Sequence, residues 1–279
     1  MDDDKSLLYA CVIDDLALIR QRLAGVTHAQ LKQATQDHGT PLHAAALVGN
    51  RTAVDLLLAA GADLERGNFV HDNAMLTCVE KGKLDMARYL LEKGSNPTRK
   101  GCQNRDALNK LVLCAWDRDF ADYLLTLGLD VNTTAVDKQN LLGDAASINN
   151  VDAIDWLLAH GANPDHLNDA LSGAIWYNAV DAAALLLDKG ADLDAMYAAA
   201  KAIRKSIYHW TAISEHRGPM IRFLIARGVD FSKVPPRPVS ATTGTTKLCP
   251  LDYAKERLGL FPQAKHIAEN IAVIENPQD

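Results

Sequence analysis

Histidine and cysteine could bind a metal or act as nucleophiles, but neither forms a motif that does so in this chain. His209 and His216 are seven residues apart with no cysteine beside them, whereas zinc sites combine His and Cys at short, fixed spacings. The five cysteines, at positions 11, 78, 102, 114 and 249, contain no C-x-x-C pair. We therefore expect no metal and no disulfide framework, but small buried thiols in a reducing compartment.

Catalytic motifs are equally weak. Cys114 precedes Trp116 and Asp117, but no histidine lies close in sequence to activate its thiol. The sequence has no glycine-rich phosphate loop ending in Lys-Ser or Lys-Thr, no G-x-S-x-G elbow and no H-E-x-x-H motif. We expect no catalytic residues and no cofactor. One enzymatic alternative remains, a site within residues 195–248, which would require a deep polar pocket there.

Composition and charge narrow the class of partner. The 279 residues carry a net charge of −6 without a Lys/Arg cluster, and aromatic residues make up only 6 %. This balance argues against a nucleic-acid or anionic-membrane surface and predicts an aliphatic core. Acids stand at positions 2–4, where a secretory signal would have bases, and no apolar run approaches 18 residues. We expect a cytoplasmic protein that is a monomer when alone.

Glycine reveals how the chain is organised. Six glycines that each follow an apolar run are separated by 33, 34, 33, 29 and 38 residues: Gly61, Gly94, Gly128, Gly161, Gly190 and Gly228. About twenty residues before the first five glycines stands a residue able to cap a helix: Thr40, Asn73, Asp106, Asn140 and Asp169. Because glycine ends helices in the left-handed conformation, each interval holds two short helices. In the clearest interval they span Pro41 to Val48 and Arg51 to Ala60.

That interval reads Thr40-Pro41-Leu42-His43-Ala44-Ala45-Ala46, followed by Gly49 and by Gly61-Ala62-Asp63, and it closely resembles the ankyrin repeat. The resemblance implies an all-α solenoid of stacked helix-turn-helix units with β-turn fingers. It also implies that Thr40 and His43 join a hydrogen-bond network between finger and helix. The other intervals match less closely.

The repeat register predicts a single domain over 1–279. It divides into an N-terminal capping repeat, five repeats, an enlarged repeat, a Pro/Thr-rich insertion and a C-terminal capping repeat, over 1–36, 37–68, 69–101, 102–134, 135–164, 165–194, 195–231, 232–248 and 249–279. The first helix of the enlarged repeat is expected to run through Ala198 to Ala200 towards Trp210. The insertion is expected to form an elongated finger or loop, either used in binding or merely tolerated.

One column of large side chains is expected to pack neighbouring second helices together: Leu56, Tyr89, Tyr123, Trp156, Leu185 and Phe223. In the ankyrin geometry, the two residues before each turn between helices face the concave side. They are unusually apolar here: Val12-Ile13, Leu47-Val48, Glu80-Lys81, Leu113-Cys114, Ser147-Ile148 and Trp176-Tyr177. Apolar side chains at a solvent-facing position are typical of a binding surface, whereas the alternative is that they pack against adjacent helices.

From this register we predict an aliphatic groove with charged fingers that binds another protein through Val48, Phe69, His71, Arg105, Ile148, Trp176, Tyr177 and Trp210. A rigid surface loses little entropy on binding, so it could inhibit a partner by covering its active site. Small ankyrin chains rich in Ala and Leu are similar to bacterial examples, some of which are immunity proteins or antitoxins for a toxin. A host-directed effector or a general scaffold is the alternative.

Overall fold

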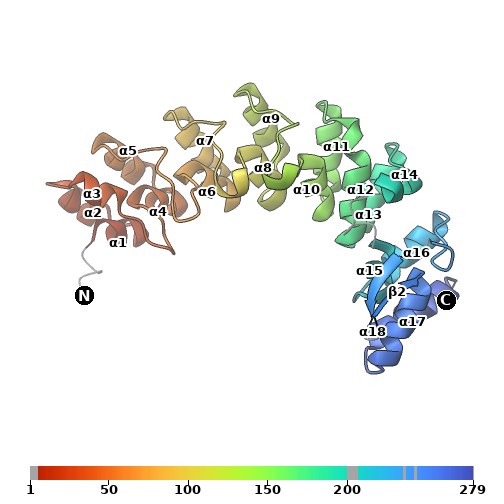
Figure 1. Cartoon of the computed structure of the whole chain (residues 1–279). Helices are drawn as coiled ribbons and strands as arrows, with labels where there is room; N and C mark the ends of the chain where they lie inside the picture. Colours follow the sequence, from red (N-terminus) through yellow and green to blue (C-terminus); the bar gives the residue numbers. More distant parts are fainter. Residues whose placement is uncertain (1–5, 200–206, 235–236, 242–243, 279) are drawn as a thin grey trace. The chain divides into compact units, whose positions relative to one another are not determined.

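The structure is a computed structural model that describes residues 6–199, 207–234, 237–241 and 244–278. The chain forms two compact units, unit 1 up to Leu141 and unit 2 from Leu142 onward. Each unit consists of short helices joined by tight turns (Figure 1). The all-α repeat architecture expected from the sequence is confirmed, with one β-hairpin added to it.

The helix pairs follow the repeat register. Unit 1 contains α1 (Leu7–Val12), α2 (Leu16–Leu23), α3 (His28–Lys32), α4 (Pro41–Val48), α5 (Arg51–Ala59), α6 (Ala74–Glu80), α7 (Leu84–Glu92), η2 (Cys102–Asn104), α8 (Ala107–Cys114), α9 (Arg118–Thr126) and η3 (Val136–Lys138). From the boundary onward follow α10 (Leu141–Ser147), α11 (Val151–Ala159), η4 (Pro164–His166), α12 (Leu167–Trp176), α13 (Val180–Asp188), α14 (Leu193–Ala199), α15 (Ile207–Ile213), α16 (Gly218–Ala226), β1 (Arg237–Ala241), β2 (Gly244–Leu248), α17 (Pro250–Leu260) and α18 (Lys265–Glu275).

Side-chain caps begin the first helices where the sequence placed them. Thr40, Asn73 and Asp106 each accept a hydrogen bond from a backbone N–H of the first helical turn. The cap predicted at Asp169 is wrong, because α12 begins earlier, at Leu167, directly after the turn η4. Pro164 starts that turn, since its fixed φ suits a first helical position.

Left-handed residues end the helices. The six glycines that define the period all have a φ between 87° and 101°. In six helix pairs, though not between α8 and α9, a second left-handed position separates the two helices, and it is occupied by Asp14, Gly49, Gly82, Asn149, Asn178 and His216. Asn and Asp tolerate this conformation better than other residues with a side chain. The turns between helices are therefore set by local backbone preference.

The predicted hydrogen-bond network of the clearest repeat is present. His43 Nδ1 lies 2.8 Å from Thr40 Oγ1 and accepts from the Thr40 N–H, so its Nε2 donates to the Asp72 carbonyl at 2.9 Å. This bond joins α4 to the finger loop of the next repeat. Burial lowers the pKa of His43, although its hydrogen bond to Asp72 and the Asp72 charge oppose that change. The imidazole is thus a neutral structural group.

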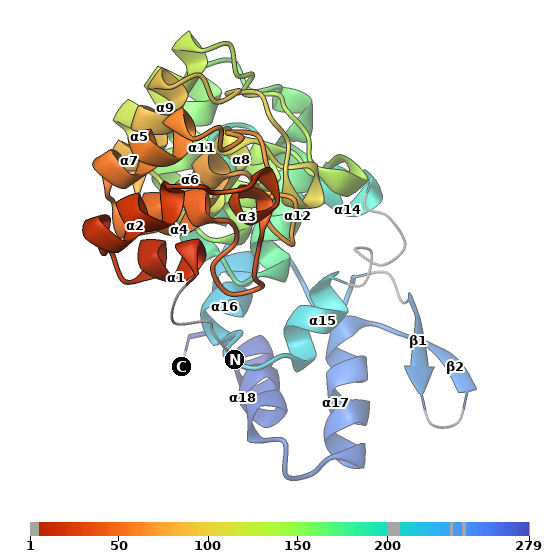
Figure 2. The same ribbon diagram turned by 90° about the vertical axis from the view of Figure 1, so that its left-hand side faces the viewer.

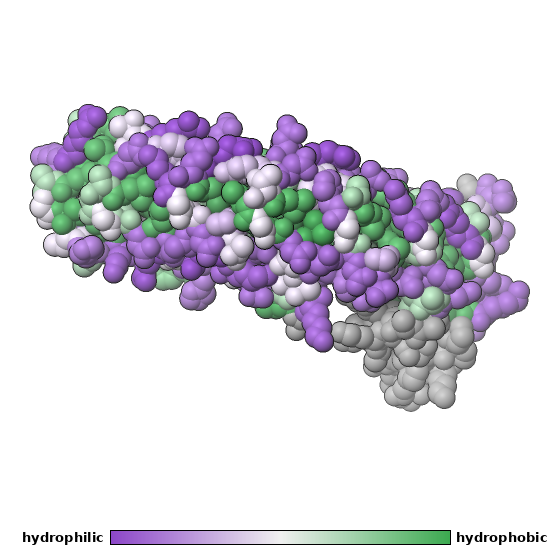
Figure 3. Space-filling view, turned by 90° about the horizontal axis from the view of Figure 1, so that it is seen from above, coloured by the Kyte–Doolittle hydropathy of each residue, from purple (hydrophilic) through white to green (hydrophobic). Residues whose placement is uncertain are grey.

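The second helices are linked by cations as well as by apolar packing. The Arg51 guanidinium of α5 lies 4.9 Å from the ring centre of Tyr89 in α7, and Arg88 of α7 lies 3.9 Å from that of Tyr123 in α9. The predicted column is therefore partly a series of cation–ring contacts, although Trp156 in unit 2 is buried. In Figure 3, which is seen from above, apolar side chains gather along the middle of the face and polar side chains lie along its edges.

The insertion forms an antiparallel hairpin in which Arg237 pairs with Leu248 and Ala241 with Gly244 (Figure 2). Proline cannot continue a helix and the threonines favour strands, which accounts for this local change. In the enlarged repeat, α14 ends at Ala199 and α15 begins at Ile207. The single long helix expected through Ala200 towards Trp210 therefore falls partly on residues 200–206, outside the described residues.

Candidate functional site

The residues that end the first helices follow one pattern of exposure. In each predicted pair the first residue is half-buried and the second is exposed. Unit 1 exposes Ile13 and Val48 in this way, and unit 2 exposes Ile148 and Tyr177. The second residue of each predicted pair therefore reaches solvent, whereas the first is partly covered by neighbouring side chains.

Unit 2 brings three aromatic residues together at this position. Trp176, at the end of α12, stacks on Trp210 of α15, with ring centres 5.5 Å apart and planes inclined by only 9°. Tyr177 follows directly and is 64 % exposed, while Trp210 is 44 % exposed and Trp176 is half-buried. We call Trp176, Tyr177 and Trp210 the aromatic patch. Large exposed rings on helices are typical anchors of protein interfaces.

Hydrogen bonds from the next repeat hold the patch in place. The Arg217 guanidinium donates to the carbonyls of Ile175 and Trp176, at 3.0 and 2.8 Å, and so caps the end of α12. Asn178 donates from Nδ2 to the His216 carbonyl at 3.1 Å. Burial lowers the pKa of Arg217, but only from an ordinary value of 12.5. The patch is thus preorganised by a buried cation that the sequence analysis did not identify.

Unit 1 presents its own apolar finger, which we call the Phe69 finger and define as residues 67–72. The Asn68 side chain accepts hydrogen bonds from the backbone N–H groups of Val70 and Asp72, at 3.0 and 3.1 Å. Phe69 is 63 % exposed at its tip, and Val70 and His71 are exposed beside it. A single asparagine therefore fixes the loop that displays these side chains, and Val70 joins the predicted set.

Arg105 is already engaged in a finger-to-finger contact within unit 1. It is half-buried, and its guanidinium donates to the side-chain oxygens of Gln103 at 3.1 Å and Gln139 at 2.9 Å. These bonds join successive fingers, so the side chain has a structural role. Its predicted role in binding stays a prediction.

A buried ion cluster below the fingers of unit 1 was missed by the sequence analysis. Lys110 of α8 is almost fully buried, and its Nζ lies 2.7 Å from Asp72 Oδ2 and 2.8 Å from Glu80 Oε2. Burial alone lowers the pKa of Lys110, but its hydrogen bonds to the two carboxylates outweigh that effect and raise it. The sequence did contain a signal for this cluster, because Lys110 stands at a helix position that is aligned with core residues of other repeats.

The residues considered for chemistry are used in other ways. His209 is buried, and its Nε2 lies 2.7 Å from the Leu248 carbonyl, whereas the exposed His216 occupies a left-handed turn. Within the described part of the chain, no group of three His, Cys, Asp or Glu side chains is arranged to hold a metal. Burial raises the pKa of Cys11 to about 12, and that of Cys114 is raised as well, so these thiols are poor nucleophiles at neutral pH.

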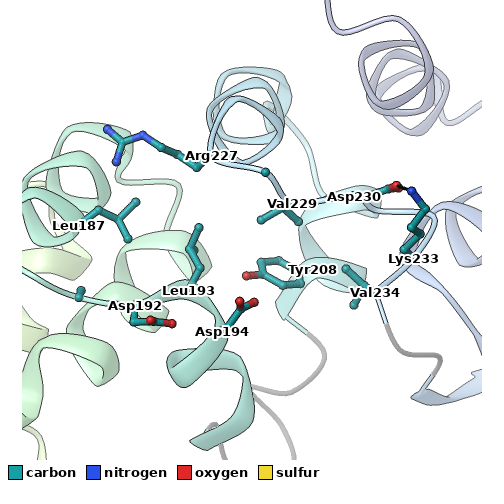
Figure 4. Close-up of a pocket in the computed structure, with 12 residues that line it drawn as sticks. Leu187, Asp192, Leu193, Asp194, Tyr208, Arg227, Val229, Asp230, Lys233 and Val234 are labelled. Atoms are coloured by element: carbon teal, nitrogen blue, oxygen red, sulfur yellow. Dashed lines mark ion pairs between the residues drawn. The ribbon is translucent and has the colours of Figure 1, made fainter.

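Unit 2 contains a pocket of about 770 Å³ where the enzymatic alternative required one (Figure 4). Leu187, Leu193 and Val229 supply apolar walls beside several charged groups. Three of those charged groups have structural partners: Asp230 is 2.8 Å from Lys233 Nζ, and Asp192 accepts from the backbone of α14. The hydrogen bond to Lys233 lowers the pKa of Asp230, which stays ionised and cannot donate a proton near pH 7.

Within the residues described, no helix is both long and apolar enough to cross a membrane. Among the described residues, the surfaces that match the predicted binding residues are the aromatic patch, the Phe69 finger and the exposed aliphatic residues at the ends of the first helices.

Comparison with known structures agrees with this architecture. The ankyrin repeat domain of Bcl-3, described as a unique member of the IkappaB protein family, is 24 % identical with a TM-score of 0.55, over 69 % of this chain and 89 % of that one. The human ASB11 ankyrin repeat domain is 23 % identical with a TM-score of 0.57, over 72 % and 89 %. An ankyrin repeat domain from Acinetobacter baumannii AYE is 25 % identical with a TM-score of 0.52, over 67 % and 98 %.

The sequence itself matches a family model. No curated protein is a match for this sequence. The model described as ankyrin repeats (3 copies) matches residues 7–101 and 111–197. Ankyrin repeats are protein–protein interaction modules and are generally non-enzymatic, and the chain, matched by this model over more than half of its residues, belongs to the ankyrin-repeat family.

Proposed function

We propose that this chain is a non-enzymatic binding protein that grips a protein partner through the aromatic patch, the Phe69 finger and the exposed residues Val48 and Ile148. The observation that carries the proposal is the aromatic patch itself: Tyr177 and Trp210 are exposed on helices whose geometry is fixed by Arg217 and by ring stacking. Burying such preorganised rings against a partner gains apolar area without ordering a loop.

We propose further that binding inhibits the partner by covering its active site, in the manner of an immunity protein or antitoxin. Each unit presents its own preorganised anchors, the Phe69 finger in unit 1 and the aromatic patch in unit 2, and such anchors can hold a partner without inserting a segment that an enzyme could process. All five cysteines are free thiols, which supports a reducing compartment, and we propose the cytoplasm.

Affinity capture from a lysate of the source cells tests the binding role. The baits are the full chain, a Tyr177→Ala/Trp210→Ala variant and a control variant, Leu260→Ala/Phe261→Ala, which removes two comparably exposed apolar residues elsewhere in unit 2. We expect a partner that is retained by the first and third baits and lost by the second. Equal capture by all three baits, with all variants folded by circular dichroism, would contradict the proposed site.

A captured partner then allows a test of inhibition. If the partner has an enzymatic or toxic activity, adding the purified chain should suppress it in stoichiometric amounts, and the Tyr177→Ala/Trp210→Ala variant should not. Full activity of the partner in the saturated complex would show that the chain is a scaffold and not an inhibitor.

A further inference from the structure

The segment that supplies most of the aromatic patch has an unusual charge distribution. Residues 142–199 contain nine aspartates but one lysine, and neither arginine nor glutamate, although the whole chain carries a net charge of only −6. Most of these aspartates are exposed, including Asp165 and Asp169. The single cation, Lys189, lies 2.7 Å from Asp155. Lys201, Arg204 and Lys205 follow within residues 200–206, which lie outside the described residues. Over residues 142–217, which carry the whole patch, ten carboxylates stand against five Lys and Arg residues, so the segment keeps a net negative charge.

Acidic groups also lie on the elements that carry the patch. Asp169 precedes Trp176 by seven residues in α12, so two helical turns place both side chains on the same face. Glu215 follows Trp210 by five residues, just beyond α15, and its side chain is 70 % exposed. The nearby cation Arg217 is turned inward onto two backbone carbonyls. The His266 imidazole lies 3.8 Å from Glu215 Oε1, but most of the Glu215 side chain is exposed, so a ligand at the rings can reach this carboxylate.

On the second helices, aromatic rings are covered by arginine side chains of this chain. Arginine guanidinium groups lie over Tyr123 at 3.9 Å in unit 1 and over Phe223 at 5.0 Å in unit 2. At the aromatic patch, by contrast, Tyr177 presents most of its surface to solvent. Exposed Tyr and Trp faces attract guanidinium and ammonium groups through the ring quadrupole, and neighbouring carboxylates strengthen that attraction.

We propose that the aromatic patch binds a cationic segment of a protein, with arginine or lysine side chains stacked on Tyr177 and Trp210 and paired with Asp169 and Glu215. This inference rests on the proposed protein-binding function and specifies its partner. Charge complementarity distinguishes this occupant from a purely apolar segment, which would gain nothing from the carboxylates, and from an anionic one, which they would repel.

The test uses the full chain and a fluorescent eight-residue peptide of alternating Arg and Gly, with Glu or Leu replacing Arg in matched peptides. We expect binding of the Arg peptide that weakens with salt, and weaker or absent binding of the Glu and Leu peptides. Tyr177→Leu/Trp210→Leu, which keeps apolar side chains but removes the rings, should weaken Arg-peptide binding about tenfold.

A matched pair of charge variants separates local from diffuse attraction. Asp169→Asn should weaken the Arg peptide several-fold, whereas Asp152→Asn, an equal charge change on the second helix α11, should change its affinity less than twofold. Failure of the Arg peptide to bind, equal binding of the Leu peptide, or equal effects of the two Asp variants would each overturn the proposal. Thermal unfolding of every variant confirms that it is folded.

The outcome also separates this inference from the proposed function. Suppose that Tyr177→Ala/Trp210→Ala loses the captured partner but the Arg peptide does not bind the normal chain. The patch then binds a protein, but it does not recognise that protein by its arginine or lysine side chains. If that variant keeps the partner, the patch is not the binding site of the partner, whatever the peptide does.

Discussion

Arg217 and the backbone of Trp176 are joined by a hydrogen bond of 2.8 Å, donated by Nη2 to the Trp176 carbonyl. The same guanidinium donates from Nη1 to Ile175 at 3.0 Å and is 9 % exposed. The Asn178 N–H also donates to the Ile175 carbonyl, at 3.2 Å, so the Trp176 carbonyl is the one for which Arg217 supplies the hydrogen bond at the end of α12. Arg217 also fixes the helix end from which Trp176 and Tyr177 project.

Replacing Arg217 tests this relationship. Arg217→Met removes both donors and leaves the Trp176 carbonyl without its hydrogen bond, whereas the Ile175 carbonyl keeps the Asn178 N–H, so we expect unit 2 to lose about 1–3 kcal/mol of stability. The near-ultraviolet circular dichroism of the stacked tryptophans should weaken as well, because the end of α12 is released. Arg222→Met, on the exposed side of α16, is the control. A near-ultraviolet spectrum and a urea midpoint equal to those of the normal chain would contradict the positioning role.

Lys110 should be far more important for stability than a surface lysine with a similar ion pair. Its partner Asp72 is also buried, so Lys110→Met leaves a buried carboxylate without its counter-charge, and we expect unit 1 to lose about 3–5 kcal/mol. Lys93 lies equally close to Asp55, at 2.7 Å, but this pair is exposed. Lys93→Met should therefore change the urea unfolding midpoint much less, and equal changes would refute the importance of burial.

The free energy of unfolding of unit 1 should decrease as the pH is lowered, because of His43. Its pKa is below 6.5 in the folded chain, chiefly through burial, so the unfolded state takes up a proton first as the pH falls. The stability contributed by neutral His43 is complete above about pH 6.5 and is lost as the pH falls towards the folded pKa. Urea unfolding between pH 8 and pH 5 should show this loss.

A substitution isolates the contribution of His43 to that pH dependence. In His43→Gln the fall in stability over this range should be smaller, although the variant is less stable at pH 8. The control is His38→Gln, because His38 is exposed, and its pH dependence should match that of the normal chain. An unchanged slope in His43→Gln would assign the pH dependence to other groups.

Gly101 should tolerate no side chain. A Cβ built there would lie 1.9 Å from Asp72 Oδ1 and 2.9 Å from Leu76 Cδ1. Asp72 cannot move freely, since it holds Lys110 and accepts from the Cys102 N–H at 2.8 Å. We expect Gly101→Ala to cost about 1–3 kcal/mol in thermal unfolding.

A glycine inside a helix provides the comparison. At Gly173 in α12 the nearest atom to an added Cβ is the Gly143 carbonyl oxygen, at 3.8 Å, which is an ordinary contact. Gly173→Ala should therefore raise stability by about 0.5–1 kcal/mol through its higher helix propensity. Destabilisation by both substitutions would show that the close approach to Asp72 is not what makes Gly101 necessary.

Much of the fold was predictable because its signals are local. Thr40, Asn73 and Asp106 cap helices through bonds to residues three positions ahead, and Gly61 ends one through its own φ. Such preferences act within a few residues and can be read in order along the chain. The error at Asp169 also has a local cause, since Pro164 starts a helical turn five residues before the cap predicted at Asp169.

The candidate site was predictable in part. The register placed Val48, Ile148 and Tyr177 at exposed ends of helices, and Phe69 at a finger tip, as the structure shows. It gave no sign that Trp176 would be half covered by Trp210 or that Arg105 would bond to two glutamines. Periodicity identifies the helix face on which a side chain lies, but it does not identify the side chain that this residue contacts in the next repeat.

The sequence alone therefore determined the repeat, its turns and the side chains that face outward, because caps, left-handed residues and helical periodicity depend on nearby residues. The tertiary structure decided which side chains meet. Lys110 finds Asp72 across 38 positions, and Arg217 finds the Trp176 carbonyl across 41. Such contacts exist only once consecutive repeats have stacked, since stacking removes water from the charges and brings their partners within hydrogen-bond distance.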